Sequence, residues 1–153
     1  MTITETTTLT PAHKTAILRL WNNEYPAKLC QTEDELEQYF ARLVHKHHFF
    51  LKNETDEILG WLFVFERDDE DWFAMILDSS IHGRGYGTKM LDVAKQKVNV
   101  LHGWATDHDR DIKADGSTYR SPLPFYLKNS FEMNPETRLE LEKLSAVKIS
   151  WRK

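Results

Sequence analysis

The sequence predicts a single mixed α+β domain over residues 1–153, with a mostly antiparallel sheet, one parallel β-α-β crossover and flanking helices. The crossover is predicted because a glycine-rich turn lies between a strand-like run and an amphipathic helix that leads into another strand. The other strand-like runs mostly follow one another through polar turns, which is typical of antiparallel neighbours. A chain of 153 residues is long enough to bury the core of one domain.

The first third of the chain predicts a strand and two helices. Residues 2–8 alternate with β-branched side chains, which favours a short strand. Pro11 is typical of a first helical position, and Pro26 ends the helix that begins there. Thr32 and Glu35 have the spacing of a capping box, so a second helix is expected to begin after Thr32.

The middle of the chain predicts three consecutive strands and then the crossover. Polar turns separate the three apolar runs, which are residues 48–53, 59–66 and 72–78. Behind the glycine-rich turn, apolar residues recur at helical spacing from Met90 to Val98. Residues 100–106 then read as the strand that completes the crossover.

The last third predicts a long loop, a short helix and a closing pair of strands. Residues 107–120 are polar, and the Asp115-Gly116 pair favours a turn within them. Residues 124–130 are expected to form the short helix. The closing strands are expected at residues 137–144 and 146–151.

The glycine-rich turn reads His82-Gly83-Arg84-Gly85-Tyr86-Gly87-Thr88. Alternating glycines let the backbone approach a ligand closely, and a helix start behind them offers free N–H groups to a phosphate. A P-loop is excluded because no Gly-x-x-x-x-Gly-Lys-Ser/Thr frame can be drawn. A dinucleotide site is disfavoured because Thr88 replaces the third glycine of that fingerprint and the chain has one crossover.

Two segments resemble the signatures of the GNAT-type N-acetyltransferases. The turn from His82 to Gly87 is similar to the family's pyrophosphate motif, Gln/Arg-x-x-Gly-x-Gly/Ala. The run Phe125-Tyr126-Leu127-Lys128-Asn129-Ser130-Phe131 is similar to its second signature, Leu/Phe-Tyr-x-Lys-x-Gly-Phe. The order of elements over nearly the whole chain also resembles that fold. Three features depart from the pattern: His82 stands in place of Gln or Arg, Ser130 in place of glycine, and the loop from Asp107 to Arg120 is longer than usual, with Tyr119 and Pro122 where the family often has Asn and Ala.

The resemblance implies acetyl-CoA as co-substrate and direct transfer of its acetyl group to a primary amine. A non-catalytic acyl-CoA-binding sensor with the same fold is the alternative. Backbone groups at the end of the fourth strand would hold the pantetheine arm, and the glycine-rich turn would hold the pyrophosphate. The residues expected to bind the coenzyme are therefore Leu77, Asp78, Ser79, His82, Gly83, Arg84, Gly85, Tyr86, Gly87 and Thr88.

Two residues are expected to carry the proton transfers. By its place in the second signature, Tyr126 is the candidate general acid, since a phenol holds its proton throughout neutral pH. Asp71 precedes the glycine-rich turn by eleven residues, matching the carboxylate base of one branch of the family. Transfer of the proton to water is the alternative to Asp71.

The acceptor is expected to contact Trp21, Glu24 and Tyr25, at the end of the first helix. Glu24 and the acids of residues 107–111 predict a negative mouth, which would favour a cationic amine. The amine itself is left open between a polyamine, an aminoglycoside, an amino acid and a protein lysine.

Charge and composition argue against several other classes of protein. The net charge of −4 gives no attraction to nucleic acid or to an anionic membrane surface, and no apolar run is long enough to span a bilayer. A lone Cys30 favours the cytoplasm. His45, His47 and His48 are expected in a connector without cysteine or acidic partners, so no metal is expected. The protein is expected to be a monomer or a homodimer.

Overall fold

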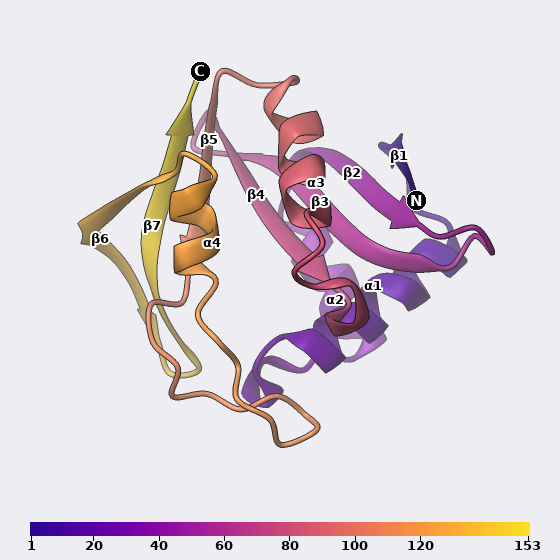
Figure 1. Ribbon diagram of the computed structural model, residues 1–153, viewed down its shortest axis with the longest axis horizontal. Coiled ribbons are helices and arrows are strands. Elements are labelled where there is room, and N and C mark those ends of the chain that lie inside the picture. Colours follow the sequence, from indigo (N-terminus) through magenta and orange to yellow (C-terminus); the bar gives the residue numbers. More distant parts are fainter.

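The computed structural model describes all 153 residues and contains one seven-stranded sheet. Its strands are β1 (Thr2–Thr6), β2 (Val44–Lys52), β3 (Ile58–Arg67), β4 (Glu70–Leu77), β5 (Val100–Ala105), β6 (Glu132–Leu141) and β7 (Leu144–Arg152). They lie side by side in the order β1-β2-β3-β4-β5-β7-β6 (Figure 1). The β4–β5 pair is parallel and every other pair is antiparallel, which confirms the predicted fold class.

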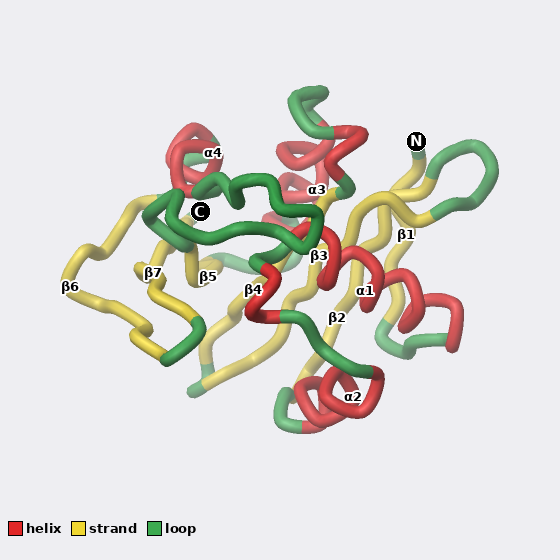
Figure 2. The backbone as a smooth tube through the Cα atoms, turned by 90° about the horizontal axis from the view of Figure 1, so that it is seen from below, coloured by secondary structure: helices red, strands yellow, loops and turns green.

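Helices cover both faces of the sheet. The helices α1 (Pro11–Glu24) and α2 (Glu33–Ala41) lie on one face, and α3 (Tyr86–Lys95) and α4 (Leu123–Lys128) lie on the other (Figure 2). Two single turns of 3₁₀ helix, η1 (Ala27–Leu29) and η2 (Ser79–Ile81), follow α1 and β4. No helix has the length and apolar content needed to cross a membrane.

Each face of the sheet has its own hydrophobic core. On the α1–α2 face, aromatic side chains dominate, with Trp61 and Phe63 fully buried under the helices. On the α3–α4 face, Met90 and Leu91 of α3 pack on Phe49 and Leu62. Strand β3 is buried along most of its length because it contributes side chains to both cores.

Strands β4 and β5 separate soon after they begin. Their parallel pairing is confined to one register position, Trp72 opposite His102. Beyond it the two strands diverge, and β5 pairs instead with β7 along its whole length (Figure 1). The second half of β4 therefore has a sheet neighbour on one side only.

Strand β2 begins at Val44, four residues before the expected start, so the three histidines lie in a strand and not in a connector. Alternate residues of a strand point to opposite faces. His47 consequently stacks on Phe49, whereas His48 stacks on Phe63 in the other core. Their rings do not converge on a common point.

The closing hairpin was also placed wrongly by the sequence pattern. Strand β6 starts at Glu132, and the turn to β7 falls at Glu142 and Lys143. Pro135 obscured this strand because proline interrupts a strand pattern. The β6–β7 register shifts between Asn134 and Arg138, so the proline sits in an irregularity of an edge strand, where its missing N–H is tolerated.

His48 is a buried base within the α1–α2 core. The indole Nε1–H of Trp61 donates a hydrogen bond to His48 Nδ1 at 3.1 Å. Burial, reinforced by the charge of Lys46, lowers the pKa of His48 to about 3. The folded protein therefore keeps this ring neutral under conditions in which an unfolded histidine takes up a proton.

We predict that His48 makes the protein less stable in mild acid. Below about pH 6.5 the unfolded chain binds a proton at this histidine, and the folded chain does not until the pH nears 3. His48 should therefore lower the free energy of unfolding by about 1.4 kcal/mol for each unit by which the pH falls in this range. In His48→Gln, the amide oxygen can still accept the hydrogen bond from the Trp61 N–H. Urea unfolding between about pH 7 and pH 5 should therefore show a free energy of unfolding that depends less on pH than in the wild type.

His47→Gln is the matched control, since this ring lies on the other face of β2. An equal pH dependence in wild type and His48→Gln would contradict the prediction.

Candidate active site

Two cavities open where β4 and β5 diverge. The smaller, of about 320 Å³, lies at the end of β4, beside the glycine-rich turn and α4. The larger, of about 630 Å³, lies over the sheet face between α1 and the β6–β7 hairpin. The residues that line both cavities are Tyr25, Met75, Tyr119, Pro122 and Tyr126. Ligands in the two cavities would therefore meet at this shared wall.

The open edge of β4 exposes backbone groups in the smaller cavity. The N–H of Asp78 bonds Leu59 in β3 at 2.8 Å. Because alternate residues of a strand bond to opposite neighbours, the backbone of Met75 and Leu77 faces the gap left by β5. The Ser79 N–H is taken by the Glu24 carboxylate. Leu77 therefore lies at the open edge together with Met75, whereas Asp78 and Ser79 use their N–H groups within the protein.

The glycines of the turn serve two different purposes. Gly83 and Gly85 have φ of +74° and +83°, and a β-carbon at either would meet no atom within 4 Å. At Gly87, in contrast, a β-carbon would lie 2.7 Å from the Phe125 ring. Gly83 and Gly85 thus shape an open turn, whereas Gly87 lets α3 approach α4.

The turn and the first turn of α3 together have the features of an anion-binding site. The N–H groups of Tyr86, Gly87 and Thr88 lie in that first turn, where no helical acceptor exists for them. The first turn contains no acidic side chain, so the positive end of the helix dipole is not neutralised. Exposed Arg84 is next to Gly85, and exposed Arg120 lines the smaller cavity. Sequence reasoning missed Arg120 because it lies in the long loop.

His82 lines the smaller cavity at the position of the expected Gln or Arg. Its Nε2 lies 2.8 Å from the carbonyl oxygen of Leu77, to which it donates a hydrogen bond. The ring therefore shares the open edge of β4 with the site proposed for the coenzyme arm. Ser130, another departure, has φ of +69° at the end of α4, with Phe131 N–H bonded to the Tyr126 carbonyl. The usual glycine would cap the helix there, so Ser130 alters a helix end and not a ligand contact.

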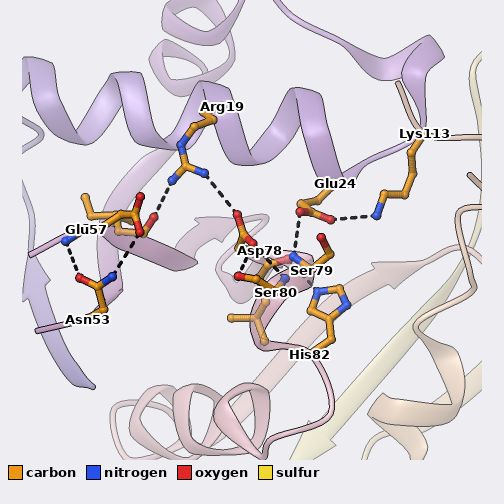
Figure 3. Close-up of polar contacts among 11 residues, drawn as sticks. Arg19, Glu24, Asn53, Glu57, Asp78, Ser79, Ser80, His82 and Lys113 are labelled. Atoms are coloured by element: carbon orange, nitrogen blue, oxygen red, sulfur yellow. Dashed lines mark hydrogen bonds and ion pairs between the residues drawn. The ribbon is translucent and has the colours of Figure 1, made fainter. Parts of the chain in front are cut away.

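Glu24 is the one carboxylate that lines either cavity, and it lies in the smaller one. The side chain is buried at the end of α1 and accepts hydrogen bonds from the Ser79 N–H at 2.9 Å and from Lys113 Nζ at 3.0 Å (Figure 3). One turn earlier, Arg19 contacts Asp78 at 3.3 Å (Figure 3). These bonds fix the end of β4 against α1.

The structure does not bring Asp71 together with Tyr126. Asp71 is the second residue of β4, six residues before Leu77, which places it roughly 20 Å from the open end of the strand. It lines neither cavity. Burial raises its pKa, and the neighbouring carboxylate of Glu66 raises it further.

Tyr126 lies in the shared wall, as a general acid would have to. Its ring is buried, with Phe73 and Phe131 packed edge-on against it at 5.5 and 5.6 Å. Its hydroxyl has no hydrogen-bond partner in the protein and is not among the fully buried unpaired atoms, so it opens on the cavities. Burial, reinforced by Tyr119, raises the pKa of Tyr126 well above its usual value. The phenol is therefore protonated at neutral pH.

The long loop, residues 106–122, is fastened to α1 and η1 and runs between α1 and α4 (Figure 2). The Ala27 N–H bonds the Ile112 carbonyl at 2.8 Å, and Lys28 pairs with Asp111 at 2.8 Å. The expected turn is present, with Gly116 N–H bonded to the Lys113 carbonyl. This anchoring carries Tyr119 to the shared wall, 6.5 Å from the Tyr25 ring. Of the residues predicted to contact the acceptor, Trp21 and Tyr25 line the larger cavity.

The acids that predicted a negative mouth are engaged within the protein. Asp107 accepts two hydrogen bonds from Arg138, at 2.8 and 3.0 Å, which lowers the pKa of Asp107. Asp109 accepts the Ser121 N–H, and Asp111 pairs with Lys28. No acidic residue lines the larger cavity. The expectation of a negative mouth was therefore wrong for this cavity.

Comparison with known proteins identifies the family and the fold. Residues 14–111 match the model of the acetyltransferase (GNAT) family. An aminoglycoside 6′-N-acetyltransferase complexed with coenzyme A is 13% identical, with a TM-score of 0.74 over 99% of this chain and 97% of that one. A spermidine N-acetyltransferase from Vibrio cholerae, in complex with CoA and spermine, is 13% identical, with a TM-score of 0.69 over 98% and 95%.

A GNAT superfamily phosphinothricin acetyltransferase from Sinorhizobium meliloti, in complex with AcCoA, is 11% identical, with a TM-score of 0.66 over 99% and 89%. No curated protein matches the sequence significantly. At these identities the solved structures show a common fold, while the family match spans more than half of the chain. The chain therefore belongs to the acetyltransferase (GNAT) family.

Proposed function

We propose that this protein is a cytoplasmic N-acetyltransferase that transfers the acetyl group of acetyl-CoA directly to a primary amine. The observation that carries the proposal is the shared wall at Tyr126, where two cavities meet beside a phenol without a protein partner. Such a wall lets the amine reach the thioester without a covalent enzyme intermediate, because both molecules can be held at once.

The residues of the smaller cavity fit the coenzyme. The backbone of Met75 and the N–H of Leu77 suit the amides of the pantetheine arm, which would add to the edge of β4 as a strand does, whereas the Leu77 carbonyl already accepts a hydrogen bond from His82. The turn from Gly83 to Thr88 suits the pyrophosphate, with Arg84 and Arg120 as nearby cations. When bound, acetyl-CoA supplies an activated acetyl group on a sulfur leaving group.

The chain must also move two protons. Tyr126 holds one at its hydroxyl and is placed to donate it to the departing sulfur. The acceptor amine must lose the other. We assign this second role to Glu24 in place of Asp71, because Glu24 lines the smaller cavity next to Tyr25 and Asp71 lines none.

Gly85→Val is predicted to abolish acetyl-CoA binding. A branched side chain would fill the open space over the turn and disfavour its positive φ. The measurement is calorimetric titration with acetyl-CoA. Gly116→Val is the matched control, since Gly116 has a similar φ of +86° and open surroundings but lies in the long loop and not in the glycine-rich turn. Unchanged coenzyme affinity in Gly85→Val would remove the pyrophosphate assignment.

Tyr126→Phe is predicted to lower kcat by about 10²–10⁴-fold with little change in acetyl-CoA affinity, because only the proton donor is lost. The phenyl ring keeps its contacts with Phe73 and Phe131. Steady-state thiol release and calorimetry separate the two effects. Tyr39→Phe, in the larger cavity but outside the shared wall, should keep kcat. Full kcat in Tyr126→Phe would make Tyr126 a packing residue.

Glu24→Gln is predicted to lower kcat by about 10²-fold near neutral pH and to recover part of it at high pH, where the amine is already deprotonated. Asp71→Asn should show the wild-type pH profile, since its side chain lies far from both cavities. If Glu24 only fastens Ser79 and Lys113, the loss will not depend on pH. The reverse pattern in the two variants would restore Asp71 as the base.

A non-catalytic acyl-CoA sensor remains the alternative function. Such a module would bind acetyl-CoA through the same turn, and it would release no thiol with any amine of a broad panel. The panel therefore decides between the two functions.

A further inference from the structure

The larger cavity has an unusual charge content for a pocket that receives amines. Its walls are mostly aromatic and aliphatic, and no aspartate or glutamate contributes to them. Arg67 is the one lining residue that carries a charge at neutral pH. A second ammonium or guanidinium group on the ligand would therefore meet a like charge and no counterion.

Arg67 has no acidic partner in the protein. The residue opposite it in the β3–β4 register is Glu70. The Glu70 carboxylate is bonded instead to His102 Nε2, at 2.7 Å. The Arg67 guanidinium lies over two aromatic rings, 5.1 Å from the centre of Phe65 and 5.4 Å from that of Trp72. The aromatic faces hold the guanidinium in place and leave its charge without a counterion.

The surroundings of Trp72 add a second observation. Trp72 is 6% exposed, and its indole N–H is buried without a hydrogen-bond partner, so it does not open on the cavity. Lys148 Nζ lies 5.3 Å from the same ring and also makes no ion pair. Two cations without ion pairs thus lie near one residue of the cavity wall. A negatively charged ligand group beside Arg67 would supply the counterion that the protein lacks there.

The positions of these groups limit the shape of the ligand. Trp72 precedes Met75, in the shared wall, by three residues of β4, which is roughly 10 Å along the strand. Flat aromatic rings, including Trp21, Tyr39 and Trp104, also line this cavity. An α-amino acid is too short to place its amine at the shared wall and its own carboxylate at Arg67.

We propose that the acceptor is an amine with an acidic group at the opposite end of a flat apolar body, and that Arg67 binds the acidic group. This inference rests on the proposed acetyl transfer only in identifying the ligand as the acetyl acceptor. The binding site for an acidic ligand stands on the position of Arg67 in the larger cavity and on its lack of an acidic partner. Charge-assisted hydrogen bonds from a guanidinium to a carboxylate are stronger than neutral ones, so Arg67 should dominate the selection.

The test uses three probes with the same ring and aminomethyl group. Opposite this aminomethyl group, 4-(aminomethyl)benzoate carries a carboxylate, benzylamine carries no further group, and 1,4-bis(aminomethyl)benzene carries a second amine. Calorimetric titration of the wild-type protein should show the benzoate binding at least about tenfold more tightly than benzylamine, with the diamine weakest. Equal affinities, or a preference for the diamine, would overturn the proposal.

Variants then assign the preference to Arg67. In Arg67→Met, the affinity for the benzoate should fall to that for benzylamine. The affinity for benzylamine itself should hardly change. Arg67→Lys keeps the charge and should retain part of the preference. Arg42→Met, at an exposed position outside both cavities, is the matched control. An unchanged preference in Arg67→Met, with thermal unfolding showing a folded variant, would also overturn the proposal.

Thiol release with the same three amines separates this inference from the proposed function. If the benzoate binds through Arg67 and no amine releases thiol, the acidic-ligand site stands and acetyl transfer fails. If benzylamine and the diamine are acetylated as efficiently as the benzoate, acetyl transfer stands and the acidic-acceptor inference fails.

Discussion

The divergence of β4 from β5 is the constraint on which the rest of the site depends. A parallel pair normally continues its hydrogen bonds along both strands, and here the pairing stops at Trp72 and His102. The unpaired edge of β4 would be a liability in a sheet interior, since buried backbone groups need partners. The arrangement is tolerable because the edge faces two cavities, where a ligand or solvent can satisfy it.

Long-range polar bonds hold this opening in shape. Arg19 and Glu24, on the same side of α1, reach across to the segment after β4, and Glu24 also binds Lys113 of the long loop. The loop is tied in turn to η1 through Lys28 and Asp111. Because Glu24 and its two partners are mutually satisfied, burial of the carboxylate is compatible with a stable fold. The same bonds explain why the opening does not collapse onto its aromatic walls.

The sequence specified those features that depend on local chemistry. The Thr32–Glu35 capping box is formed with both reciprocal bonds, and Gly85 adopts the positive φ that its place before α3 demands. Tyr126 was found through its signature, because the residues that orient it are close in sequence. Local patterns failed where a distant partner decides the outcome. Asp107 looked like part of a negative surface, but its partner, Arg138, is 31 residues away.

Strand positions show the same limit. The pattern placed Asp71 on the correct strand but could not tell which end of β4 would open, because that depends on where β5 departs. It likewise could not reveal that Arg67 would be left without an acid, since Glu70 bonds His102 from a strand that comes 30 residues later. The charge of the larger cavity is thus a property of the assembled sheet and not of any segment.

Three of the five tryptophans, Trp21, Trp72 and Trp104, line the larger cavity. Indole emission responds to the polarity and charge around the ring, and a guanidinium already lies over Trp72. Any molecule that enters this cavity must therefore alter the surroundings of most of the indoles in the protein. The protein in this way contains its own optical reporter of occupancy of this cavity, without a label or a coupled reaction.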